Sequence, residues 1–96
     1  MLDVGIAYGQ DLNEVKEAVR EAAGSLIADP DLGALVTDEP EVMGVEDLGE
    51  SRTTVRVEAG TLPGRQATVE RALRQCINEA FERRGILAGA GSGQSG

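Results

Sequence analysis

The chain has few of the residues that carry most protein chemistry. It contains no His and no Trp, and only one Cys, one Tyr and one Phe among 96 residues. The lack of His removes the commonest metal ligand and acid-base group near neutral pH, and Cys76 alone cannot form an internal disulfide. We therefore expect a reducing, cytoplasmic setting. Because aromatic residues are scarce, the core must come from small aliphatic side chains, and association with other subunits would add buried area.

Basic residues and long apolar runs are also scarce. Nine Lys and Arg stand against seventeen Asp and Glu, a formal net charge of −8. This charge repels phosphate backbones and anionic lipid, so we expect no nucleic-acid partner. No apolar run approaches the roughly 20 residues that span a bilayer, and the N-terminus lacks the features of a signal peptide. The length allows one domain at most, and we expect it not to enter the membrane itself.

Apolar residues at every second position predict a strand at the start of the chain, from Leu2 to Tyr8. Asp11 then suits a helix N-cap, with Glu14 three residues later as in a capping box. Pro30 ends this helix near Ala28. Its apolar face is expected to comprise Leu12, Val15, Val19, Ala22, Leu26 and Ile27.

The middle of the chain predicts an ordered loop followed by a β-hairpin. Residues 29–41 contain turn formers and are expected to form a connection with one helical turn. Val42 to Leu48 reads as a second strand, in which Met43 and Val45 share one face. After a turn, residues 53–59 alternate as a third strand, and the side chains expected to face the core are Val55 and Val57.

A second amphipathic helix follows the Gly and Pro residues at positions 60–64. Arg83 and Arg84 suit its C-terminal dipole, Gly85 can adopt the left-handed conformation that ends a helix, and Ile86 can reach back toward Phe81. Residues 1–87 are expected to form the domain, and residues 88–96 a flexible Gly/Ser tail or an artificial linker. The core positions expected in the helix are Val69, Leu73, Cys76, Ile77, Ala80 and Phe81.

The order strand, helix, strand, strand, helix predicts an α+β, ferredoxin-like sandwich. Right-handed crossovers place both helices on one face of an antiparallel sheet, with the first strand beside the third. The usual fourth strand is missing or vestigial. We therefore expect the outer edge of the first strand to be open, or covered by Ile86 to Ala88 or by another chain.

No set of residues predicts catalysis, a cofactor or a metal. The turn before Asp11 resembles a phosphate-binding turn, but the Asp11 carboxylate occupies the place of the anion. Cys76 has no His to activate it and is expected to be buried filler, and Tyr8 is expected to be a partly buried ring. The dispersed arginines predict surface ion pairs: Arg56, Arg65, Arg71 and Arg74. The loop acids match no calcium-binding loop: Asp29, Asp31, Asp38, Glu39 and Glu41.

Several segments in a fixed order carry a family resemblance. They are the strand ending at Tyr8 with its Asp11-capped helix, the Asp29-Pro30 turn, PEVMGVEDLGES at 40–51, TTVRVEA at 53–59, PGRQ at 63–66, and the helix closing on Gly85-Ile86. From about Val4 to Ile86 the chain resembles the C-terminal α/β domain of the small-conductance mechanosensitive channel (MscS) family. It departs from the family where LAGAGSGQSG replaces a Pro-containing strand, and where Ala67 replaces a common aromatic residue.

The resemblance implies a fragment of an inner-membrane channel that opens under osmotic stress. Its domain would form, on the cytoplasmic side, part of the wall of a heptameric vestibule through which ions and osmolytes pass, without catalysis, and its partners would be copies of the same subunit. The alternative is a stand-alone ferredoxin-like module that oligomerises and binds a small effector, as ACT-like domains do. An enzyme is a third hypothesis, without a catalytic constellation to support it.

Overall fold

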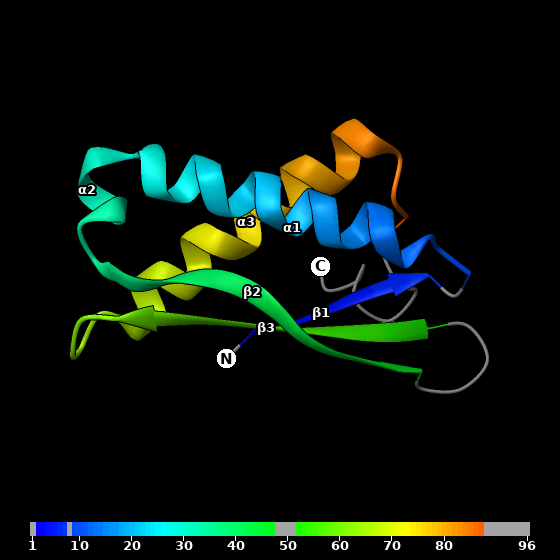
Figure 1. Cartoon of the computed structure of the whole chain (residues 1–96), viewed down its shortest axis with the longest axis horizontal. Coiled ribbons are helices and arrows are strands. Elements are labelled where there is room, and N and C mark those ends of the chain that lie inside the picture. Colours follow the sequence, from blue (N-terminus) through cyan, green and yellow to red (C-terminus); the bar gives the residue numbers. More distant parts are fainter. Residues whose placement is uncertain (1, 8, 48–51, 88–96) are drawn as a thin grey trace.

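The structure is a computed structural model that describes residues 2–7, 9–47 and 52–87. Its elements are β1 (Leu2–Ala7), α1 (Leu12–Ala28), α2 (Pro30–Gly33), β2 (Val36–Asp47), β3 (Arg52–Thr61) and α3 (Gln66–Arg84). The described strands form one antiparallel sheet in the order β1-β3-β2. α1 and α3 lie over the same face of this sheet (Figure 1). The predicted α+β, ferredoxin-like arrangement is confirmed.

The core lies between the helices and the sheet. On β1, Leu2 and Val4 stand opposite Val57 and Val55 of β3, and since directly paired residues share a face, all four point toward the helices. The helices contribute most of the remaining buried residues of the core. Their buried residues are Val15, Ala18, Val19, Ala22, Ala23 and Leu26 from α1, and Val69, Leu73, Ile77, Ala80 and Phe81 from α3.

The bounds of α1 match the prediction, but some residues near its ends have other roles than expected. Asp11 caps the helix as expected, because its Oδ1 accepts a hydrogen bond from the Asn13 amide at 2.9 Å. Glu14 instead pairs with Arg84 and does not close a capping box. Leu12 and Ile27, expected in the core, are each 42% exposed, because helical periodicity does not show where a helix extends past its neighbours. Ala18 and Ala23 are buried instead.

β2 begins at Val36, six residues before the predicted start at Val42. Residues 29–41 do contain the expected helical turn, α2, but Asp38 and Pro40 do not break the strand that follows. β2 is an edge strand, where a missing N–H is tolerated, and its register shifts on both sides of Asp38. A further shift between Val42 and Gly44 turns Val42 toward the core and leaves Met43 55% exposed, which corrects the expected alternation of this strand.

The end of α3 follows the prediction. Gly85 has a φ of 74°, in the left-handed region that favours glycine. The Ile86 amide donates to the Phe81 carbonyl oxygen at 2.9 Å, and the Ile86 side chain is buried. The next residue reaches the outer edge of β1, where the Ala7 amide donates to the Leu87 carbonyl oxygen at 3.0 Å. This edge is therefore covered at Ala7 by part of the segment expected there. Tyr8, Leu48 and the expected tail at 88–96 lie outside the described residues.

Phe81→Ala is expected to lower the free energy of unfolding by about 3–5 kcal/mol, because the ring is almost fully buried against the core. Chemical denaturation followed by circular dichroism measures the loss. Met43→Ala, at an exposed position, should stay within about 0.5 kcal/mol of the parent. A loss below about 1 kcal/mol for Phe81→Ala would show that α3 does not pack as described.

Two glycine substitutions are expected to act in opposite directions. A Cβ on Gly24 of α1 meets no atom within 4 Å, so Gly24→Ala should raise the stability by about 0.5–1 kcal/mol through helix propensity. A Cβ on Gly33 would collide with the backbone carbonyl oxygen of Ile27, so Gly33→Ala should lower it. The denaturant midpoints of the two variants test this difference, and equal midpoints would contradict the close approach of α2 to α1.

Candidate functional site

An ion-pair cluster joins the C-terminal end of α3 to α1. Arg84 Nη1 lies 2.9 Å from Glu14 Oε1, and Arg84 Nε lies 3.3 Å from Glu21 Oε1. Arg83 Nη2 is 3.5 Å from the same Glu21 oxygen. The hydrogen bonds that Arg84 donates to the carboxylates of Glu14 and Glu21 raise the pKa of Arg84, which therefore stays charged. The cluster fixes how the helices lie against each other, and its exposed side chains leave it open to screening by salt.

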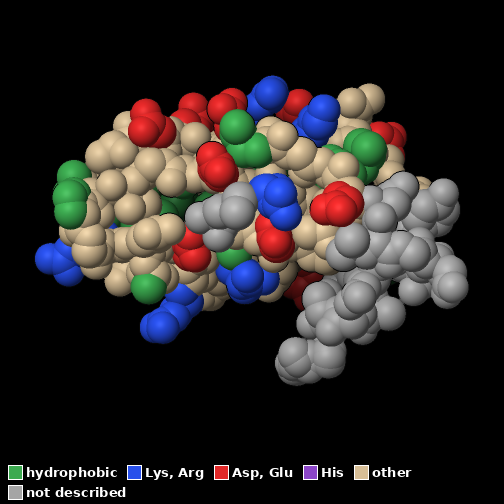
Figure 2. Space-filling model, turned by 90° about the horizontal axis from the view of Figure 1, so that it is seen from below, with side chains coloured by type: hydrophobic (Ala, Val, Ile, Leu, Met, Phe, Trp, Pro, Cys, Tyr) green, Lys and Arg blue, Asp and Glu red, His purple; other side chains and the backbone are tan. Residues whose placement is uncertain are grey.

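In the described part of the chain, no helix lies over the face of the sheet opposite α1 and α3, and this face is polar. Figure 2 shows this face, on which acidic and basic side chains are interspersed and few hydrophobic ones appear. Asp3 and Arg56 are directly paired across β1 and β3, and their side chains form an ion pair at 3.2 Å. Glu41 and Glu58 are paired across β2 and β3, where two like charges face each other. Such a face suits contact with water and mobile ions.

The predicted surface arginines divide into two groups. Arg56 forms the expected ion pair with Asp3, and Arg74 Nη1 donates to the Asp3 backbone oxygen at 3.4 Å. Within the described residues, Arg65 and Arg71 have no ion pair. Arg71 and Arg74 are three residues apart on α3 and therefore lie on one side of that helix.

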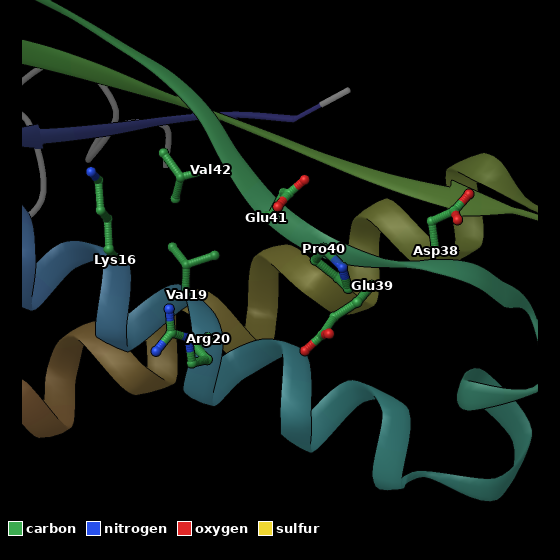
Figure 3. Close-up of a pocket in the computed structure, with 8 residues that line it drawn as sticks. All are labelled: Lys16, Val19, Arg20, Asp38, Glu39, Pro40, Glu41 and Val42. Carbon is green, nitrogen blue, oxygen red and sulfur yellow. The ribbon is translucent and has the colours of Figure 1, made fainter.

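A groove of about 540 Å³ separates α1 from β2. Val19 and Val42 point toward each other across it, and the buried Pro40 lies beside them (Figure 3). Lys16 and Arg20 project from α1, whereas the Glu39 side chain points from β2 toward α1. No ion pair joins the two walls, although both are described in full. The sequence did not predict this groove, because it depends on how β2 and α1 lie in space.

Of the residues considered for chemistry, Asp11 has its predicted structural role and Cys76 differs from its prediction. The Asp11 carboxylate caps α1. Cys76 is only partly buried, which corrects the expectation of a fully buried thiol, and burial together with Glu79 raises its pKa. Among the described residues, no group of three or more His, Cys, Asp or Glu side chains is placed to hold a metal ion. In the same part of the chain, no helix has both the length and the apolar character to cross a bilayer.

The chain is an α+β domain, and the features found on its described surface are ion pairs, a charged sheet face and a groove. The family described as "Mechanosensitive ion channel MscS, C-terminal" matches residues 1–87. The chain belongs to this family, and the sequence-based resemblance is confirmed. Mechanosensitive channels are not an enzyme family, so the channel hypothesis is favoured over both the effector-binding module and the enzyme.

A curated relative agrees with the family. The chain is 29% identical over 79 residues to the moderate conductance mechanosensitive channel YbiO of Escherichia coli (strain K12). The aligned region covers 82% of this chain but 11% of YbiO. The chain thus spans about one ninth of the length of this relative, in which most residues lie outside the matched region.

The rate of Cys76 alkylation by iodoacetamide is expected to keep rising above pH 9. The thiolate is the reactive form, and its raised pKa keeps the folded thiol protonated at neutral pH. Because the fold favours the protonated thiol, its contribution to stability is complete below the pKa of the unfolded chain and is lost as the pH rises through the folded pKa. The chain in urea provides the control, with a normal thiol pKa. A plateau near pH 8 in the folded protein would contradict the burial of Cys76.

Proposed function

We propose that this domain is part of a mechanosensitive channel subunit and forms part of the wall of a cytoplasmic vestibule. Copies of the subunit pack side by side in a ring, seven in number as the family resemblance implies, and ions and small osmolytes pass through openings in the wall during hypo-osmotic stress. The pore-forming helices belong to other parts of the subunit. The observation that carries the proposal is the family match over residues 1–87.

The domain acts by position and charge. Its helices and sheet form a rigid unit with a continuous core, which suits a wall that keeps its shape while the membrane region moves. Its surface is acidic overall, because seventeen Asp and Glu outnumber nine Lys and Arg. A charged wall raises the local concentration of counter-ions and biases which solutes enter.

The proposal is tested with the full-length channel that carries this domain, expressed in bacteria that lack their own mechanosensitive channels. We expect survival of hypo-osmotic shock and tension-activated currents in membrane patches. Removal of residues 2–87 should abolish both, because the subunits lose a packing surface, whereas the exposed Met43→Ala variant should behave as the parent. A full-length protein that reaches the membrane but shows no tension-activated current would overturn the proposal.

A further inference from the structure

The two lateral sides of the domain carry opposite charges. β2, at one edge of the sheet, has five acidic residues and no basic one in the sequence VTDEPEVMGVED. Of the four arginines of α3, Arg83 and Arg84 pair with acids of α1, which leaves Arg71 and Arg74. α3 reaches the opposite edge, where Arg74 bonds to the Asp3 carbonyl oxygen of β1. One lateral side is thus acidic, and the other presents the arginine pair Arg71 and Arg74.

This distribution limits how two copies can meet. With a net charge of −8, copies repel one another unless their few basic residues face acidic ones. Contact between two β2 edges would oppose acids to acids, and contact between two arginine sides would oppose the arginines. Contact of one copy's α3 side with the next copy's β2 edge pairs opposite charges, and it is head-to-tail, as a closed ring requires.

The groove between α1 and β2 is the surface on which we locate this contact. Glu39 points into the groove without an ion-pair partner in the described chain, and Val19, Pro40 and Val42 offer an apolar floor for the carbon stem of an arginine. Lys16 and Arg20 on the α1 wall repel an arginine and direct it to the β2 wall. We propose that Arg71 and Arg74 of one copy dock on Glu39 in the groove of the next copy. This inference rests on the proposed assembly of identical subunits.

Cysteine crosslinking in the full-length channel tests the contact. Cys76 and any cysteines outside this domain are replaced by Ser, and Arg71→Cys and Glu39→Cys are introduced together. Treatment with a short bismaleimide should give a ladder of covalent multimers, because every copy then links to both of its neighbours. Each single variant should give no ladder. The control pair Arg71→Cys with Arg65→Cys, both on the α3 side of the domain, should also give none.

Charge reversal gives a second readout. For this readout, the crosslinkable cysteines are placed outside this domain of the full-length channel. Arg71→Glu with Arg74→Glu should lower the yield of the ladder about tenfold or more, and adding Glu39→Arg should restore part of it. Arg65→Glu makes the same kind of charge change outside the contact and should have no effect. Two results in an assembled channel overturn this contact while leaving the proposed function intact. One is that the Arg71 and Glu39 pair gives no ladder, and the other is that the control pair gives a ladder. A full-length protein that stays monomeric overturns both.

Discussion

The packing of α1 and α3 against Val55 and Val57 of the central strand holds the structure together. Both valines are almost completely buried, and they stand opposite Val4 and Leu2 of β1. Every described element contributes to the cluster around them, either by a buried residue or through partly buried ones, which are Leu32 in α2 and Val36 and Val42 in β2. A core made of small aliphatic side chains tolerates little loss of contact, because each side chain contributes only about 1.5–3 kcal/mol on burial. The shape of the domain depends on this core.

The surface features follow from the position of that core. Both helices occupy one face of the sheet, so within the described residues no helix covers the other face or the β2 edge. β2 protects its own edge with a proline, charged residues and irregular pairing, which natural edge strands use to prevent pairing with another sheet. At the edge of β1, by contrast, Leu87 and Arg74 form hydrogen bonds with backbone groups of the strand. The two edges therefore differ in the backbone groups and side chains that they present.

Much of this fold could be predicted from the sequence, because most of its signals are local. Alternation identified β1 and β3, and Asp11 and Gly85 marked the start of one helix and the end of the other. The beginning of β2 could not be predicted, because Asp38 and Pro40 are turn formers whose effect is overridden at an irregular sheet edge. The ion pair of Glu14 with Arg84, 70 residues apart, and the groove between α1 and β2 depend on tertiary packing.

The central claim is that a rigid, non-catalytic domain works by joining identical copies into a closed wall. Native mass spectrometry of the full-length channel in detergent tests this claim most directly. We expect one dominant species with a mass equal to a fixed number of subunits, which is seven subunits in the proposed ring. This species should dissociate when the core is disrupted. A monomer, or a continuous distribution of sizes without a closed species, would contradict it.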